Sequence, residues 1–205
     1  NEQAPRSGEA PLPEPSLIAE AQGMARIAVI DHVPGKNENG LLSALLAIDA
    51  AHQSIDIENA YFILDPAVLR ALRRAKDRGV RIRILTNSSE SIDEPVVTYP
   101  ILKSAEQARR EGVEVYLKKG STLHSKFMIV DQSFVWIGSY NLQPRSFLIE
   151  EEVMYGILDK DFAASLGSSF ESDISEAAAA HGVEEIKAPF SISSRLVYYL
   201  FYNQL

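Results

Sequence analysis

Strand-like and helix-like segments alternate along the middle of this chain, and this alternation restricts the possible folds more than any other feature. Short runs rich in apolar and β-branched residues are separated by segments with apolar residues at helical spacing. The strand-like runs are 26–30, 54–62, 80–86 and 113–119. The helical segments are 40–51, 65–79 and about 100–112. Strands that alternate with helices of this length predict an α/β fold, in which helices cover the faces of a sheet.

The segment 65–79 also carries the residue types expected at the two ends of a helix. Asp65 is suited to cap the N-terminus, Pro66 to stand at the first helical position, and Gly79 to end the helix. The polar stretch "TNSSESIDEP" that comes after the next strand is expected to be a loop.

The pattern changes after residue 120, where strand-like runs follow one another without long helices between them. These runs are 124–130, 134–140 and 152–158, and the turn "DQS" joins the first two. They predict antiparallel strands added to the same sheet. A helix is predicted over 159–180, interrupted near Gly167.

The two ends of the chain differ from this pattern. Residues 1–22 contain four prolines and no sustained apolar period, which predicts a flexible linker or leader before a domain over 23–180. Because Asn1 is not a methionine, we expect a trimmed or processed chain. The tail 181–205 includes "RLVYYLFYNQL", whose aromatic and aliphatic residues fit either a helix resting on lipid or one docked on protein.

Composition excludes few functions. The formal net charge is −8 and the sequence pI is about 5.1, which argues weakly against a nucleic-acid-binding domain, since such domains usually have a pI above about 9. The chain has no cysteine, so it has no disulfide and no thiolate metal site. No run approaches the roughly 20 apolar residues that a membrane-spanning helix needs.

Residues 122–141, "TLHSKFMIVDQSFVWIGSYN", gather polar side chains within an apolar hairpin. Side chains alternate along a strand, so His124 and Lys126 project on the same face. An imidazole beside an ammonium suits a phosphate, because the imidazole can attack phosphorus or transfer a proton while the lysine neutralises the oxygens. Ser139 and Asn141 repeat the two-residue spacing and add hydrogen-bond donors.

Each of these residues also has a structural interpretation. A single histidine at a strand end is more often structural than catalytic, and Asp131 is most simply the residue that holds the turn. "GSYN" alone is a common turn sequence, and Tyr61 and Phe62 are more simply explained by core packing. The combined pattern of His124, Lys126, Asp131, Ser139 and Asn141 is much more specific than any of its parts.

That combined pattern resembles the HxKxxxxD signature and the following GSxN of the phospholipase D superfamily. "GSYNLQPRSFLIEEEV" is similar to the corresponding stretch of bacterial cardiolipin synthases, particularly their C-type branch. "VIDHVPGK", "NAYFILDP" and "RGVRIRILTNSSESID" resemble the stretches before the second signature of those enzymes. The likeness covers about residues 26–160. It implies a mixed sheet with helices on both faces, as one half of a pseudo-two-fold pair.

The resemblance also implies a mechanism. One histidine forms a phosphohistidine with the phosphodiester, the other protonates the leaving alcohol, and no metal or organic cofactor takes part. His124 matches the second motif, which implies general acid and then general base. The implied catalytic residues are His124, Lys126, Asp131 and Glu152, and the implied phosphate ligands are Lys126, Ser139 and Asn141. Glu152 matches a carboxylate that orients the catalytic histidine, whereas Glu150 stands where the C-type branch often has asparagine.

The chain departs from the family in having only one His-x-Lys. Its other histidines are at 32, 52 and 181, and none of them begins a second motif. We therefore expect either the C-terminal half of a larger two-motif protein or a homodimeric site. The similarity to the second half, the proline-rich leader and the missing initiator methionine favour the larger protein.

Three functions follow as hypotheses. The leading one is a phosphatidyltransferase like cardiolipin synthase, acting on a phosphatidylglycerol-like phospholipid at the bacterial inner membrane through peripheral contact. The second is a homodimeric single-motif nuclease, against which the acidic balance and the absence of a basic stripe count. The third is a non-catalytic half that keeps its motif only to bind a phosphate or a lipid.

Overall fold

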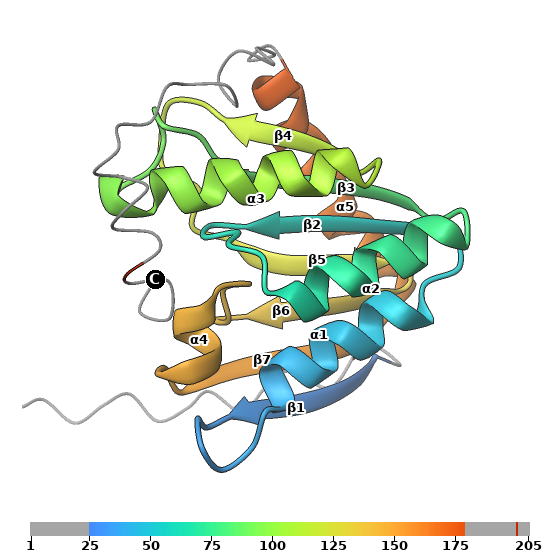
Figure 1. Ribbon diagram of the computed structural model, residues 1–205. Helices are drawn as coiled ribbons and strands as arrows, with labels where there is room; N and C mark the ends of the chain where they lie inside the picture. Colours follow the sequence, from blue (N-terminus) through green and yellow to red (C-terminus); the bar gives the residue numbers. More distant parts are fainter. Residues whose placement is uncertain (1–24, 179–199, 201–205) are drawn as a thin grey trace, which may run out of the picture.

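The computed structural model describes residues 25–178 and Leu200, which form a seven-stranded sheet with helices on both faces (Figure 1). The strands are β1 (Arg26–His32), β2 (Ser54–Asn59), β3 (Arg81–Asn87), β4 (Glu114–Lys118), β5 (Lys126–Val130), β6 (Phe134–Gly138) and β7 (Glu152–Leu158). The helices are α1 (Asn39–Ala50), α2 (Pro66–Asp77), α3 (Thr98–Arg110), α4 (Pro144–Leu148) and α5 (Lys160–Ala178), with a 3₁₀ turn, η1 (Pro95–Val97). The linker predicted at 1–22 and the tail predicted at 181–205 lie outside the described residues, apart from Leu200.

The strand order, β1-β7-β6-β5-β2-β3-β4, makes the sheet mixed. β2, β3 and β4 are parallel, because helical crossovers connect them, whereas all other neighbouring pairs are antiparallel. The predicted fold class and the predicted antiparallel addition are therefore confirmed. β5 lies between β6 and β2 and is antiparallel to both, so the hairpin that carries the His-x-Lys occupies the middle of the sheet.

Each face of the sheet has its own apolar core. On the face covered by α1 and α2, side chains such as Ile48, Leu72 and Trp136 are fully buried against the inward residues of the strands. On the opposite face, Phe170 and Ile174 of α5 pack on β3, β5 and β6. Figure 1 shows α1, α2 and α3 in front of the sheet and α5 behind it. This arrangement is the predicted sheet with helices on both faces.

Helix α5 runs without a break through Gly167, so the interruption predicted there is wrong. A glycine within a helix costs only about 1 kcal/mol, and contacts to the sheet outweigh that cost. Arg83 of β3 bonds Glu171, and Lys118 of β4 bonds Asp173 and Glu176. These ion pairs and the buried Phe170 hold the second half of α5 on the sheet.

The expected caps of α2 are present. The Asp65 carboxylate accepts a hydrogen bond from the Ala67 amide at 2.6 Å, and Pro66 is the first helical residue. Gly79, which follows the helix, has a positive φ of 85°, as expected at a helix C-terminus. Helix α4 was not predicted, because only its first residue, Pro144, gives a local signal.

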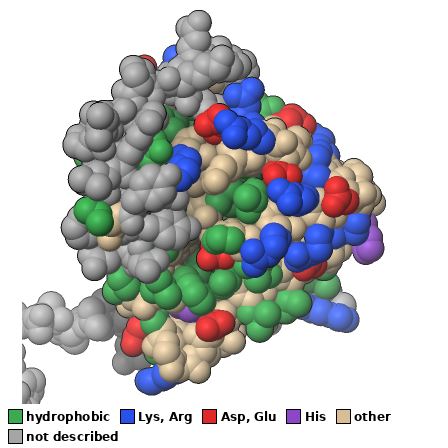
Figure 2. All heavy atoms as spheres, viewed as in Figure 1, with side chains coloured by type: hydrophobic (Ala, Val, Ile, Leu, Met, Phe, Trp, Pro, Cys, Tyr) green, Lys and Arg blue, Asp and Glu red, His purple; other side chains and the backbone are tan. Residues whose placement is uncertain are grey.

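The face that carries α2 and α3 shows basic side chains with acidic ones among them (Figure 2). Several of these charges are paired, as in Arg73–Glu111, Arg74–Asp49 and Arg110–Glu106. Apolar side chains gather lower in the same view, over α1 and α4. Within the described residues, no helix combines the length and the apolar character that crossing a bilayer requires.

Candidate functional site

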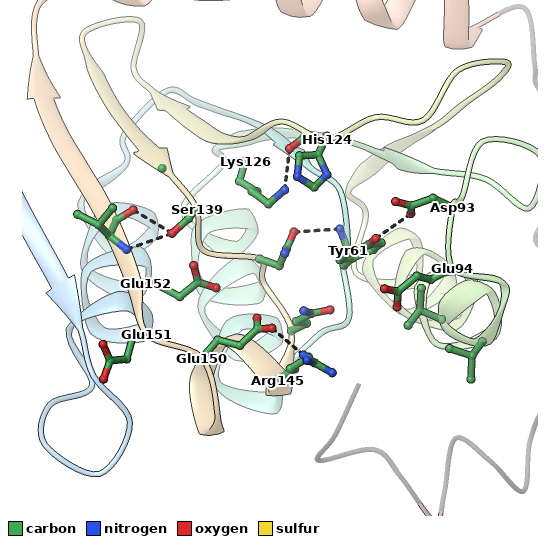
Figure 3. A pocket seen from close by; sticks show the side chains of 16 residues that line it. Tyr61, Asp93, Glu94, His124, Lys126, Ser139, Arg145, Glu150, Glu151 and Glu152 are labelled. Carbon is green, nitrogen blue, oxygen red and sulfur yellow. Dashed lines mark hydrogen bonds and ion pairs between the residues drawn. The ribbon is translucent and has the colours of Figure 1, made fainter. Parts of the chain in front are cut away.

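A pocket of about 1030 Å³ opens beside the C-terminal ends of β2 and β3 (Figure 3). Its walls come from the segment after β2, the loop between β3 and α3, the hairpin β5–β6, and the segment from β6 to β7. The lining residues are Tyr61, Asp93, Glu94, Val96, Val97, His124, Lys126, Gly138, Ser139, Asn141, Gln143, Arg145, Glu150, Glu151, Glu152 and Val153. Five of the six predicted site residues therefore share one pocket.

His124 and Lys126 lie together at the entrance to β5, as their spacing predicts. His124 is exposed and precedes the strand, whereas Lys126 is its first residue and is 8% exposed. The Lys126 ammonium donates a hydrogen bond to the His124 carbonyl at 2.7 Å. Burial lowers the pKa of Lys126, although the negative charges of Glu152, Asp93 and Glu150 oppose that shift. A phosphate in the pocket meets an imidazole and a partly desolvated cation side by side.

Ser139 is placed by a close approach of β6 to β7. A Cβ atom on Gly138 would come within 2.1 Å of the Val153 carbonyl oxygen, so no other residue fits without separating the strands. Ser139 pairs with Val153 directly, since its hydroxyl accepts the Val153 amide proton at 3.1 Å. The glycine of GSxN therefore brings the serine to the pocket wall.

Asn141 is also fixed at the pocket wall. Its side chain is buried, and its Oδ1 accepts a hydrogen bond from the Tyr61 amide at 3.3 Å. The Ser146 hydroxyl accepts the Asn141 amide proton at 3.3 Å. The Asn141 side-chain oxygen is already bonded to Tyr61 and its backbone amide to Ser146. Asn141 can therefore offer a phosphate oxygen the N–H groups of its side-chain amide.

Glu152 is one of five carboxylates that line the pocket: Glu150, Glu151 and Glu152 lie on one side of it, and Asp93 and Glu94 lie on the other (Figure 3). Among the described residues no hydrogen bond joins the Glu152 carboxylate to the His124 imidazole, so the predicted orienting role stays a prediction. Glu150 pairs with Arg145 at 2.6 Å. The departure from the C-type pattern expected at this position stays a prediction.

Asp131 lies outside this pocket, at the other end of β5 from Lys126. Its carboxylate accepts hydrogen bonds from the amides of His52, Gln53 and Ser54 at 2.7–2.9 Å. It does not line the pocket with the other predicted site residues, and its assignment to the catalytic residues stays a prediction. The alternative interpretation, that Asp131 holds a turn, fits these contacts, which tie the β5–β6 turn to the start of β2.

Sequence reasoning favoured core packing for Tyr61 and assigned no role to Asp93 or Arg145, although all three line the pocket. Tyr61, expected in the core, is only partly buried and donates a hydrogen bond to Asp93 at 2.7 Å, while Phe62 is buried as expected. Burial and the bond to Asp93 raise the pKa of Tyr61. Arg145, on the other side of the pocket, pairs with Glu150. The polar composition of residues 86–95 was a signal for a functional loop, but nothing in it indicated which strand it faces.

Comparison with known proteins agrees with this geometry. The family model described as "Cardiolipin synthase, PLD-like domain" matches residues 45–174. Cardiolipin synthase A of Pseudomonas aeruginosa is 38% identical over 129 residues, which are 63% of this chain and 26% of that protein. Cardiolipin synthase 1 of Staphylococcus epidermidis is 33% identical over 129 residues with the same shares. The chain thus spans about a quarter of the length of these relatives.

Solved structures share the fold. Nuc from Salmonella typhimurium, a phospholipase D family member, superposes with a TM-score of 0.65 and 21% identity, covering 75% of this chain and 96% of that one. Phosphatidylserine synthase from Haemophilus influenzae gives a TM-score of 0.70 with 12% identity, covering 91% and 49%. The expected similarity to phospholipase D proteins is confirmed, whereas the C-type branch stays a prediction. Because the family model matches more than half of the chain, the chain belongs to the PLD-like domain family of cardiolipin synthases.

Proposed function

We propose that this chain supplies one His-x-Lys half of a phosphatidyltransferase site that moves a phosphatidyl group from one phospholipid to an alcohol. The observation that carries the proposal is the presence of His124, Lys126, Ser139 and Asn141 in one pocket. Together these side chains offer a proton-transfer group, a cation and neutral donors to a single phosphodiester. The family membership supports a lipid phosphodiester as the substrate.

The reaction has two steps. An imidazole nitrogen of the other half attacks phosphorus, a P–N bond forms as the P–O bond to the leaving alcohol breaks, and protonated His124 gives its proton to the leaving oxygen. An acceptor alcohol then attacks phosphorus, the P–N bond breaks, and neutral His124 takes the proton of that hydroxyl. Lys126 and the Asn141 amide stabilise the charge on the non-bridging oxygens in both steps.

The carboxylates that line the pocket favour a small, hydroxyl-bearing phosphodiester over a polyanion. Five carboxylates line the pocket, and Arg145 is already paired with Glu150. A nucleic acid strand would bring several phosphates against them, whereas phosphatidylglycerol brings one phosphate and hydroxyl groups that can donate to carboxylates. We therefore take phosphatidylglycerol as donor and acceptor, with cardiolipin and glycerol as products, at the surface of the bacterial inner membrane.

Completion of the site needs a second His-x-Lys. His32 is buried and bonds the Phe147 carbonyl, and His52 is at the opposite end of the sheet, beside Asp131.

The intact mass of the native gene product in its source cells identifies the missing half. A mass well above the 22.7 kDa of this chain supports a second half on the same polypeptide. A mass equal to it requires a homodimeric site.

The proposal is tested with the intact gene product and vesicles of phosphatidylglycerol, by measuring cardiolipin and released glycerol. His124→Ala removes the proton-transfer group and should lower turnover by about 10²- to 10⁴-fold. His52→Ala is the matched control, because it removes an exposed imidazole far from the pocket, and it should leave turnover unchanged.

Three outcomes would contradict this assignment. Undiminished turnover in His124→Ala would remove His124 from the chemistry. A wild-type protein that binds phosphatidylglycerol vesicles without any turnover would instead support the non-catalytic half. Cleavage of DNA in place of lipid would support the nuclease.

A further inference from the structure

Two buried asparagines end neighbouring parallel strands and bond the chain neighbours of pocket residues. Asn59 is the last residue of β2 and Asn87 the last residue of β3, and their side chains are 1% and 0% exposed. Neither lines the pocket. A buried primary amide is costly unless its donors and acceptor are satisfied, so what these two amides bond is informative.

Asn87 uses its amide to hold the residue that precedes His124. Its Nδ2 donates to the Leu123 carbonyl at 2.9 Å, and its Oδ1 accepts the Leu123 amide proton at 2.9 Å. The Asn87 side chain thus bonds both backbone groups of Leu123, as a neighbouring strand would. A second donation, to the Ala60 carbonyl at 3.0 Å, and an accepted bond from the Ser91 hydroxyl at 2.8 Å complete the set.

Asn59 does the same for the residues on either side of Asn141. Its Oδ1 accepts the Leu142 amide proton at 3.1 Å, and its Nδ2 lies 3.5 Å from the Tyr140 carbonyl that it donates to. The side chain of Asn141 is in turn bonded by the amide of Tyr61, two residues after Asn59. The end of β2 therefore determines where the Asn141 side chain meets the pocket.

These bonds act just beyond the ends of the strands. His124 lies before the first residue of β5, and Asn141 lies beyond the last residue of β6, so neither belongs to a strand. The two side-chain amides add to the backbone hydrogen bonds of these segments, which join Ala60 to Ser125 at 3.1 Å and Ile63 to Leu142 at 2.9 Å. Since a misplacement of about 1 Å can lower a rate about 10²-fold, the position of these backbone segments matters to the chemistry as well as to stability.

We infer that Asn59 and Asn87 are positioning residues, which set His124 and Asn141 at the spacing that one phosphate requires. The inference rests on the proposed function for its effect on turnover, but the geometric part can be measured without turnover. Replacing Asn87 shifts His124, and replacing Asn59 shifts Asn141, without changing any group that touches the substrate.

The test uses Asn87→Ser, with Thr86→Val as the matched control. Thr86 is also fully buried and donates to the same Ala60 carbonyl, at 3.4 Å, but it does not bond Leu123. Both variants lose a buried hydrogen bond, so both are compared at a temperature at which circular dichroism shows them folded. In the intact gene product, Asn87→Ser should lower kcat about 10- to 100-fold with KM unchanged, while Thr86→Val keeps the wild-type kcat.

A second readout follows the His124 imidazole by NMR of the 205-residue chain, with His124→Ala used for assignment. Asn87→Ser should shift and broaden the His124 ring signals and leave those of His52 in place, whereas Thr86→Val should leave both. Unmoved His124 signals in folded Asn87→Ser, or an equal loss of kcat in the two variants, would overturn the inference.

The two proposals can fail separately. If the wild-type protein turns over no phospholipid but Asn87→Ser still moves His124, the positioning holds and the proposed function fails. If Asn87→Ser does not fold, Asn59→Ser gives the same test, read from the side-chain amide signals of Asn141. Signals of Asn141 that stay at their wild-type positions in folded Asn59→Ser would then reject the positioning role.

Discussion

At the scale of single residues, the signature histidine and the signature aspartate work at opposite ends of one strand. His124 and Lys126 face the pocket, while Asp131 ties the far end of β5 to the start of β2 through three backbone amides. Asp131 adopts a positive φ of 49°, a conformation that aspartate and asparagine tolerate better than most residues. β5 therefore connects the pocket at one end to the backbone of residues 52–54 at the other.

Asp131→Asn isolates the charge of that carboxylate, because asparagine keeps the shape and tolerates the same backbone conformation. Burial alone would raise the pKa of Asp131, but the amide bonds from Ser54, His52 and Gln53 lower it below the ordinary 3.8. The folded-state pKa is therefore depressed, so the stabilisation is fully present above pH 3.8 and is lost as the pH falls through the folded-state value. We expect Asp131→Asn to cost about 1–3 kcal/mol at pH 7.

Urea denaturation from pH 7 downward checks this prediction. The difference in unfolding free energy between wild type and variant should be constant down to about pH 5 and shrink below the ordinary aspartate pKa. Asp31→Asn, which changes an exposed carboxylate bonded to Asn37, is the control and should stay within about 0.5 kcal/mol of wild type. A difference that does not depend on pH would contradict the charge-based explanation.

Residue-level prediction succeeded where a side chain acts through local spacing. His124, Lys126, Ser139 and Asn141 share a pocket because each pair alternates along the chain and the hairpin brings the pairs together. Asn59, Asn87 and Arg145 were missed, because their roles depend on which strand lies next to which. The need for glycine at position 138 depends in the same way on the carbonyl of Val153.

At the scale of elements, α5 is held on the sheet by cations that rise from the strands. Arg83 makes a two-point ion pair with Asp56, and both side chains are about 9% exposed. Its guanidinium also pairs with Glu171 of α5. The same guanidinium lies 5.1 Å from the centroid of the Phe170 ring, which is on α5 too. Local periodicity predicted this helix, but the glycine rule that predicted a break at Gly167 contains no information about the partner surface. Contacts with the sheet decide the helix length.

Arg83→Met is expected to destabilise the domain far more than Glu171→Gln. The first change leaves the buried Asp56 carboxylate without its partner, which costs about 3–5 kcal/mol. The second removes a charge from a side chain that is 59% exposed, and such surface pairs contribute under about 1 kcal/mol. Chemical denaturation followed by circular dichroism measures both.

The double variant Arg83→Met with Asp56→Leu tests the cause. It removes both buried charges and should recover most of the stability lost in Arg83→Met. If the double variant is no more stable than Arg83→Met, the loss does not come from the unpaired carboxylate, and the contact of the Arg83 guanidinium with the Phe170 ring would be the better explanation.

At the scale of the whole molecule, apolar side chains flank the mouth of the pocket. Val96, which lines it, is 51% exposed, and Leu148 and Ile149, between Arg145 and Glu150, are 45% and 53% exposed. If the substrate is a phospholipid, as proposed, these side chains face the surface from which it comes. Figure 2 shows exposed apolar side chains over α4 and α1.

We expect the double variant Leu148→Asp, Ile149→Asp to lose at least tenfold in turnover on phosphatidylglycerol vesicles, because each side chain buried in lipid contributes about 1.5–3 kcal/mol. Turnover of dispersed short-chain phosphatidylglycerol should stay at the wild-type rate. Leu46→Asp changes an apolar side chain on α1 that is 61% exposed and lines a separate groove, and it serves as the control. Equal losses on vesicles and dispersed lipid would argue against a membrane-facing rim.

The pairing of β1 with β7 bears on how the chain comes to be folded. β1 is the first strand in the sequence, yet its only neighbour within the described sheet is the last strand. During synthesis, Ile27 and Val29 of β1 therefore remain without a partner strand until β7 has been made. Because Glu152 and Val153 at the start of that last strand also line the pocket, closing the edge of the sheet and completing the pocket belong to the same late event.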